Sequence, residues 1–278
     1  MVDEIPRSRQ ARDAAEQALV RVVHHYGDKP EFVVPGGLVP ELLCSSGSHQ
    51  HAGTTDIDVQ VNLEIECGAV NTERLERALK NSEFKPDDEN VWRWRLENDE
   101  TRTVVKFEML ADRNDQPEDV TFKFENCEHL GAVNLRGTRF AVEDIEVRTL
   151  TAKVGDNRLT VDINVTGVAG FLLAKCAAAH KRRLPKDWYD IAFVLLHNNL
   201  GSHLNAASAV IEKFRGQLPG LKTSLDDLAA NFVDPKSQGP VAYSDQYLIE
   251  YPEIDVATAK VDAIIGVETF YKELSEHL

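Results

Sequence analysis

The sequence is poor in cysteine and contains no long apolar run. Its cysteines are widely spaced and form no Cys-x-x-Cys pair: Cys44, Cys67, Cys127 and Cys176. We therefore expect no disulfide framework and no zinc site, and a reducing, cytoplasmic setting. No segment approaches the roughly 18 apolar residues of a membrane span, and the acidic N-terminus lacks the apolar core of a signal peptide. These absences predict that no membrane is a partner.

Positive charge is also scarce. The formal net charge is −15 over 278 residues, which argues against broad, sequence-independent binding of nucleic acid. A local basic track is still possible, because Lys181, Arg182 and Arg183 form a cluster between Lys175 and Lys186. With 42% hydrophobic and 28% charged residues, the chain has the composition of a globular protein with one large or two smaller domains.

The character of the chain changes near residue 165. Before it, short apolar runs with turn residues between them predict strands; after Gly167, helical spacing of apolar residues dominates. The predicted strands are 31–34, 55–63, 91–96, 103–110, 121–124, 139–142 and 158–163. The predicted helices are 8–26, 38–44, 72–80, 168–183, 187–198, 202–215, 224–232 and 256–278, with Ser8 capping the first and a loop or lid at 233–240.

Two carboxylates follow a glycine pair in the strand-rich part. Gly36 and Gly37 end one apolar run, and Asp56 and Asp58 lie in the next. Side chains two residues apart on a strand share a face, about 6–7 Å from each other. Such pairs are often merely solvated, but aspartate is a poor strand former and a glycine turn leaves backbone N–H groups available to phosphate oxygens. The pattern is that of a site for divalent cations and a polyphosphate.

A third carboxylate is expected on a neighbouring strand. Glu108 is the first candidate, since it lies within the predicted strand 103–110 and could both complete a metal site and accept a proton. It could equally be an ordinary exposed residue. Asp112, near the end of the same strand, is the alternative third carboxylate.

The helical part supplies a cation. Lys175 lies in the middle of an otherwise apolar helix, where a lysine either extends its ammonium to solvent or meets a specific anion; we favour a triphosphate. Asp190 also lies in an apolar helix and needs a partner if it is buried, for which Lys175 or Arg183 is suited. Asp187 is expected at the N-cap or in the first turn of that helix.

Other polar segments are weaker candidates. His49 and His51 form a His-x-His pair, but we expect them on the surface of a loop. Gly36-Gly37 has no Walker lysine at the required spacing and is not Gly-x-Gly-x-x-Gly, so neither a P-loop nor a Rossmann site is predicted.

Four segments, taken in order, resemble the nucleotidyltransferases of the DNA polymerase β superfamily. More narrowly, the chain resembles the AbiEii family, the toxins of type IV toxin–antitoxin systems, which include the MenT group. The resemblance covers about residues 36–196. It rests on Gly36-Gly37 with Thr54-Thr55-Asp56-Ile57-Asp58, on Phe107-Glu108-Met109-Leu110, on Lys175-Cys176-Ala177-Ala178-Ala179, and on Asp190-Ile191-Ala192-Phe193-Val194-Leu195-Leu196.

The resemblance implies an α+β fold. A mixed-sheet nucleotidyltransferase domain over 1–165 would be followed by an all-helical C-terminal domain over 166–278 that completes the nucleotide cleft. It also implies transfer of NMP from an NTP to an acceptor hydroxyl, with two Mg²⁺ ions held by Asp56, Asp58 and Glu108, the last of which stands where the family usually has aspartate.

The remaining site residues are implied by the same resemblance. The nucleotide would be bound by Gly36, Gly37, Thr54, Lys175 and Arg183. Lys175 would neutralise the leaving pyrophosphate, and Asp190 would hold the basic residues in place.

The acceptor implied by the resemblance is the 3′ end of tRNA, and a cognate antitoxin would be a partner. Two alternatives stay open. The same chemistry could act on a small molecule such as an aminoglycoside-like antibiotic, whose positive charge suits an acidic chain. The chain could also be a non-catalytic nucleotide-binding module.

Overall fold

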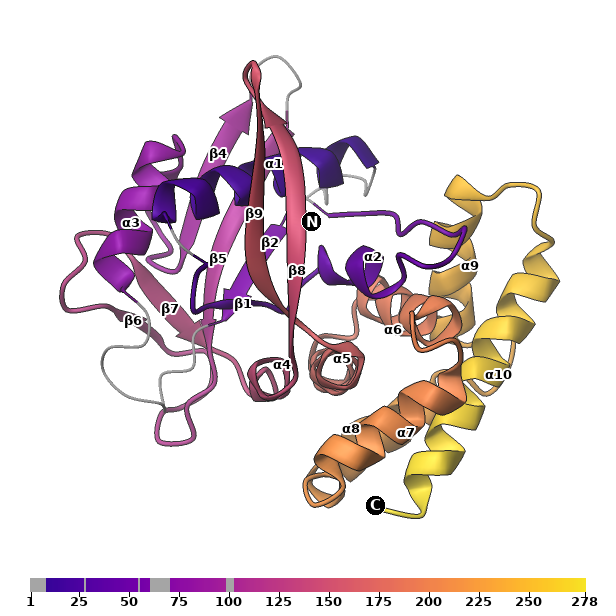
Figure 1. Cartoon of the computed structure of the whole chain (residues 1–278). Helices are drawn as coiled ribbons and strands as arrows, with labels where there is room; N and C mark the ends of the chain where they lie inside the picture. The colour runs from indigo at the N-terminus through magenta and orange to yellow at the C-terminus, as the bar shows by residue number, and fades with distance from the viewer. Residues whose placement is uncertain (1–8, 28, 55, 61–70, 99–102) are drawn as a thin grey trace. The chain divides into compact units, whose positions relative to one another are not determined.

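The computed structural model describes residues 9–27, 29–54, 56–60, 71–98 and 103–278 (Figure 1). In these residues the protein is α+β, with a mixed sheet and a large share of helix, as the coarse fold class predicts. The chain divides into two compact units. The sheet unit comprises Met1–Val39 and Gly53–Thr166, and the helical unit comprises Pro40–Ala52 and Gly167–Leu278.

The sheet unit is built on one mixed sheet. Within the described residues the strand order is β3-β4-β5-β2-β1-β9-β8, and β7, with β6 beyond it, also pairs with β5. β2 and β5 are parallel, whereas β1 with β2, β4 with β5 and β8 with β9 are antiparallel. The strands are β1 (Val33–Val34), β2 (Asp56–Gln60), β3 (Lys85–Pro86), β4 (Arg93–Asn98), β5 (Thr103–Ala111), β6 (Thr121–Lys123), β7 (Gly131–Asn134), β8 (Ile145–Val154) and β9 (Asn157–Thr166).

The two faces of β2 and β5 differ in polarity. Ile57, Val59 and Phe107 are fully buried, while the charged residues that alternate with them, Asp56, Asp58, Lys106 and Glu108, are partly exposed. Alternating side chains of a strand point to opposite faces, so one face is core and the other is charged. Helix α1 (Arg9–Tyr26) packs across the sheet, and α3 (Thr72–Asn81) packs beside α1 (Figure 1).

The helical unit is arranged around α6 (Pro185–His197). Residues 187–195 of this helix are all buried, as expected for a helix that is apolar on every side. It contacts α5 (Val168–Arg182), α7 (His203–Phe214), α9 (Gln238–Glu250) and α10 (Val256–Ser275). The remaining elements are α2 (Val39–Leu43), η1 (Leu218–Leu221) and α8 (Lys222–Ala230).

The sequence predicted neither a disulfide framework nor a membrane-spanning segment, and the described residues bear on both expectations. Of the cysteines placed there, Cys44, Cys127 and Cys176 are buried and free. None of the described helices combines the length and apolar character needed to cross a bilayer.

Three sequence-based assignments are wrong. The segment predicted as strand 139–142 is helix α4 (Arg139–Glu143), because the Asp112 carboxylate accepts the Arg139 N–H and so starts a helical turn. Strand β8 was not predicted, since its apolar Ile145 and Val147 are exposed and its pairing with β9 decides its conformation. Residues 238–240, predicted as loop, begin α9.

Several predicted features fall outside the described residues. These are the Ser8 cap, the strand residues 55 and 61–63, and part of the turn between β4 and β5.

Phe107 anchors the core beneath the charged face and generates a stability prediction. Its ring contacts Phe32 and Phe84 in edge-to-face geometry. We expect Phe107→Ala to lower the free energy of unfolding of the sheet unit by about 3–5 kcal/mol, because it leaves a cavity. Urea unfolding in a Trp188→Phe background measures this, since Trp92 and Trp94 then report on the sheet unit.

The matched control for this core substitution is Phe122→Ala, at a half-buried position on β6. An equal loss in both variants would contradict the assigned core.

Candidate functional site

The register of β2 and β5 places three predicted acids on one face of the sheet. Asp58 lies directly beside Glu108 across the parallel strand pair, and Asp56 lies beside Lys106. Neighbouring strands are about 4.8 Å apart, so the Asp58 and Glu108 side chains start side by side. The placement expected for Glu108, on a strand next to the Asp-x-Asp strand, is therefore confirmed.

Basic residues on the same face partly balance these acids. Arg93, opposite Glu108 on β4, donates from Nε to Oε1 of Glu108 at 2.6 Å. The Lys106 ammonium lies 3.3 Å from Oδ1 of Asp56. The result is a compact array of alternating charge rather than a purely acidic patch. Sequence reasoning did not select Lys106 or Arg93, although the period of two along β5 signals that Lys106 and Glu108 share a face.

Glu108 has an unusual affinity for its proton. Burial, followed by the repulsion of Asp58, outweighs the attraction of Arg93 and raises the pKa of Glu108 to about 7. A carboxyl group with this pKa can exchange a proton near neutrality, which an ordinary surface glutamate does not do.

The glycine pair lies directly against the acidic strand. A Cβ added to Gly36 would lie 2.0 Å from Oδ2 of Asp58, and one added to Gly37 would lie 2.8 Å from Cβ of Thr54. Any side chain at either position would displace these groups, so glycine is required by close approach. Thr54 in turn accepts the Asp56 N–H at 3.1 Å through its hydroxyl. The predicted residues Gly36, Gly37, Thr54 and Asp58 thus form one contiguous group.

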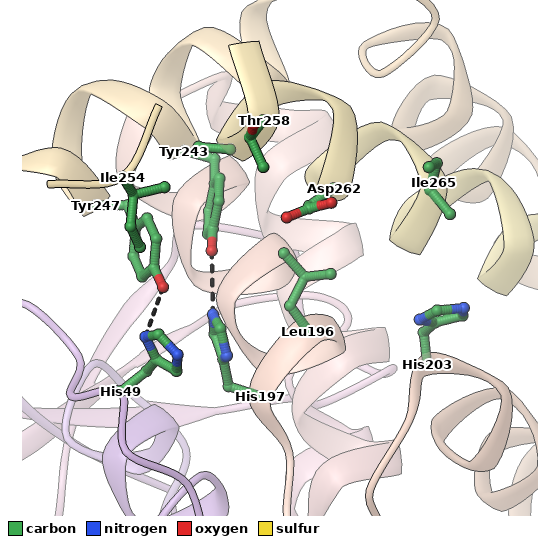
Figure 2. Close-up of a pocket in the computed structure, with 11 residues that line it drawn as sticks. His49, Leu196, His197, His203, Tyr243, Tyr247, Ile254, Thr258, Asp262 and Ile265 are labelled. Atoms are coloured by element: carbon green, nitrogen blue, oxygen red, sulfur yellow. Dashed lines mark hydrogen bonds between the residues drawn. The ribbon is translucent and has the colours of Figure 1, made fainter. Parts of the chain in front are cut away.

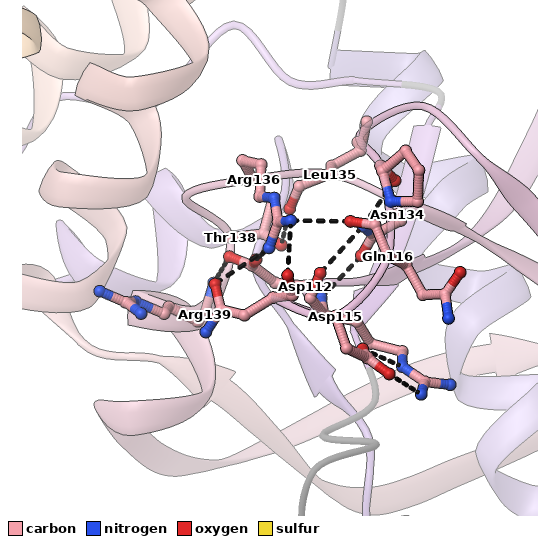
Figure 3. A network of polar contacts seen from close by, with 11 residues as sticks. Asp112, Asp115, Gln116, Asn134, Leu135, Arg136, Thr138 and Arg139 are labelled. Atoms are coloured by element: carbon pink, nitrogen blue, oxygen red, sulfur yellow. Dashed lines mark hydrogen bonds and ion pairs between the residues drawn. The ribbon is translucent and has the colours of Figure 1, made fainter.

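The alternative third acid, Asp112, belongs to a different network. It lies four residues after Glu108, roughly 13 Å along the chain if the strand geometry continued. Its carboxylate accepts the Arg139 N–H at 2.9 Å and lies 3.8 Å from the Arg136 guanidinium (Figure 3). Asn134 occupies the centre of the same network and donates to three backbone carbonyls. Asp112 is therefore engaged at the start of α4, whereas Glu108 is paired with Arg93 beside Asp58.

Lys175 and Asp190 meet in the interior of the helical unit. The Lys175 ammonium lies 2.8 Å from Oδ2 of Asp190 and 3.3 Å from Oδ1 of Asp187. Both aspartates are fully buried, and the Lys175 side chain is 11% exposed. Burial alone would lower the pKa of Lys175, but Asp190 and then Asp187 outweigh it, so the pKa is raised and the lysine stays charged.

Two further residues complete this buried cluster. His51 is 1% exposed and its Nε2 lies 2.9 Å from Oδ1 of Asp190, so the surface position predicted for His51 is wrong. The Arg182 guanidinium lies 2.7 Å from Asp187. Asp187 lies in the first turn of α6 and is not its N-cap residue, which is Leu184. Nothing in the sequence near His51 signals burial, because its partner is 139 residues away.

Arg183 does not join the cluster. It ends α5 in the left-handed conformation, with φ of 52°, and its guanidinium lies 2.8 Å from Asp227 of α8. Of the two partners considered for Asp190, the structure pairs it with Lys175 and not with Arg183.

The predicted site residues therefore form two groups, each within its own unit. The sheet unit holds Gly36, Gly37, Thr54, Asp56, Asp58 and Glu108; the helical unit holds Lys175 and Asp190, with Arg183 apart from them. As the described side chains stand, no three acidic, histidine or cysteine groups are gathered closely enough to hold a metal ion.

The raised pKa of Glu108 predicts a pH-dependent stability. Because the folded pKa, about 7, lies above the ordinary value of 4.5, the stabilising contribution is fully present below about pH 4.5 and is lost as pH rises through 7. We expect the unfolding free energy of wild type, relative to Glu108→Gln, to fall by on the order of 2–3 kcal/mol between about pH 4.5 and pH 8. Urea unfolding followed through Trp92 and Trp94 measures it.

Glu97→Gln is the control for this pH dependence, since Glu97 is exposed on the adjacent β4. A constant difference between wild type and Glu108→Gln across the pH range would contradict the assignment.

The buried cluster of the helical unit predicts a large effect of Lys175→Met. The substitution leaves two fully buried aspartates without their ammonium partner, which costs about 3–5 kcal/mol. The same exchange at Lys222, which pairs with Asp226 on the surface of α8, should cost far less, because solvent screens an exposed ion pair. Chemical unfolding monitored by far-ultraviolet circular dichroism measures the free energy of unfolding of both variants. Similar decreases in the two variants would show that Lys175 does not form a buried ion pair.

The chain was compared with protein-family profiles, with curated proteins and with solved structures, and none of the three comparisons gave a significant match. Family membership is accordingly a prediction that rests on the motifs and on the geometry of the two residue groups.

Proposed function

We propose that this protein is a Mg²⁺-dependent nucleotidyltransferase that transfers NMP from an NTP to an acceptor hydroxyl. The observation that carries the proposal is the lateral pairing of Asp58 with Glu108 on parallel strands, with Asp56 on the same face and Gly36 packed against the Asp58 carboxylate. This arrangement joins a cluster of oxygen ligands to a backbone turn that phosphate groups can approach.

The residues fit a magnesium site in their chemistry. Mg²⁺ prefers carboxylate oxygens together with substrate phosphates, and Asp56, Asp58 and Glu108 would hold two ions. When bound, the ions would supply positive charge to the reacting phosphate and to the leaving group. Burial is the first cause of the raised pKa of Glu108, and the repulsion by Asp58, which is the second, would be relieved by a cation. Binding would also require Arg93 and Lys106 to release their carboxylate partners.

The chain's own residues would contribute position and proton transfer. The backbone at Gly36 and Gly37 would approach the phosphates, and Thr54 would keep the start of β2 in place through its bond to Asp56. Glu108 would accept the proton of the acceptor hydroxyl as its oxygen forms a bond to the α-phosphorus. The bond between the α-phosphorus and the bridging oxygen would break, and pyrophosphate would leave.

The parts assigned to Lys175, Asp190 and Arg183 in this reaction come from the resemblance. Lys175 would neutralise the charge of the leaving pyrophosphate, and Asp190 would orient the Lys175 ammonium. Arg183 would contact the nucleotide. The close pairing of Lys175 with Asp190 supports the orienting role, because it fixes the ammonium in one position.

The acceptor is proposed on the same resemblance to be the 3′ end of tRNA. The protein would then be the toxin of a type IV toxin–antitoxin system, restrained by a cognate antitoxin. The net charge of −15 favours a second candidate, a polycationic small molecule of the aminoglycoside type, as the acceptor.

Labelling with each NTP carrying radioactive α-phosphate separates these functions. The protein is incubated with Mg²⁺ and either total tRNA or an aminoglycoside mixture. We expect label to enter RNA with wild type and to fall by about 100-fold or more in Asp58→Asn, which keeps the shape of the side chain but removes its charge. Asp156→Asn, on the exposed turn between β8 and β9, is the matched control and should behave as wild type.

Each outcome of the labelling decides one claim. Label in a small acceptor or in the protein, but never in RNA, would exclude the tRNA function and retain the chemistry. Equal labelling by wild type and Asp58→Asn, or none with any acceptor, would exclude the enzyme. Titration of both proteins with Mn²⁺ tests the metal site independently of activity, since only wild type should bind it saturably.

A further inference from the structure

The helical unit contains a pocket of about 490 Å³ that lies outside the residues used above (Figure 2). It is bounded by the loop that carries His49, the C-terminal end of α6, the tyrosines of α9 and one side of α10. Pockets for small organic ligands commonly have volumes of about 300–1,000 Å³. The size is therefore that of a site for a small molecule rather than for a single ion.

One wall of this pocket is a series of nearly parallel aromatic rings. His49 stacks on His197 with centroids 4.6 Å apart, and His197 stacks on Tyr247 at 5.6 Å with an angle of 20°. Tyr243 and Tyr247 are stacked at 4.9 Å and 19°. Such a wall presents flat faces to which a further planar ring can stack.

Hydrogen bonds hold these rings in place, and burial keeps the His197 imidazole uncharged. The Tyr247 hydroxyl lies 2.6 Å from Nδ1 of His49, and the Tyr243 hydroxyl lies 3.0 Å from Nε2 of His197 (Figure 2). Burial, and then the neighbouring His49, lower the pKa of His197 to about 3, so this imidazole is neutral at physiological pH. The wall is thus held in place by hydrogen bonds, and the His197 imidazole in it is available for stacking as a neutral ring.

The opposite wall comes from α10 and carries an acid. Thr258, Asp262 and Ile265 border the pocket from this helix (Figure 2). Asp262 acts on the aromatic wall electrostatically: burial first, and then nearby groups that include Asp262, raise the pKa of Tyr247 to about 12. The residues that line the pocket, all of them described, include no lysine or arginine, the side chains that most often bind a polyphosphate.

We propose that this pocket binds an aminopurine nucleoside or a compound of that class, with its ring stacked on the His197–Tyr247 wall and its amino group donating to Asp262. A flat ring matches the parallel stack, and an amino group matches the carboxylate at the rim. The absence of lysine and arginine from the lining residues favours a ligand without phosphate groups. The proposal is independent of the nucleotidyltransferase function.

Calorimetric titration of the full chain with adenosine, in the presence of a metal chelator, tests the pocket. Purine riboside, which lacks the amino group, is the comparison ligand. We expect saturable binding of adenosine and about tenfold weaker binding of purine riboside, the size of one hydrogen bond to a charged group. Asp262→Asn should reduce this difference to about twofold or less, whereas Asp245→Asn, exposed on α9, should preserve it.

A second variant locates the site. Thr258→Trp, at an exposed position on α10, fills the pocket from its rim and should abolish adenosine binding. The proposal is overturned if adenosine shows no saturable binding to wild type, if the two nucleosides bind equally, or if binding survives Thr258→Trp. The comparison of the two nucleosides on wild type needs no variant to fold.

Discussion

The parallel pairing of β2 with β5 is the constraint on which the charged face depends. It sets Asp58 beside Glu108 and Asp56 beside Lys106, and the buried Phe107 and Ile57 on the reverse face keep that register from slipping by one residue. Two carboxylates held side by side repel each other, and the sheet tolerates them because Arg93 and a proton on Glu108 share the charge. The core thus enforces an arrangement that the charges alone would avoid.

The sequence predicted the members of this group because short-range rules govern them. The period of two put Asp56 and Asp58 on one face, and the glycine pair marked a close approach. The neighbour of β2, however, was expected only because a metal site needs a third carboxylate. No local pattern encodes it, because strand order depends on contacts between distant parts of the chain. The strand predicted at 139–142 failed for the same reason: its helical state follows from Asp112, which lies 27 residues earlier.

In the helical unit, too, contacts between residues close in sequence were predicted and contacts between distant residues were missed. The apolar surroundings of Lys175 and Asp190 showed that each needed a partner. The two residues are only 15 positions apart, on consecutive helices that pack against each other, so their pairing could be anticipated. The contribution of His51 depends on a contact over 139 residues, which no local pattern encodes. The ring stack around His197 was missed because its members come from the loop before β2, from α6 and from α9.

The assignment of Pro40–Ala52 to the helical unit affects how this protein can be dissected. The backbone passes from one unit to the other after Val39, after Ala52 and after Thr166, so neither unit is a single continuous length of chain. A fragment beginning at Gly167 would lack the imidazole that meets Asp190 and the one that stacks on His197. Neither unit can therefore be excised or exchanged intact by a single cut in the chain.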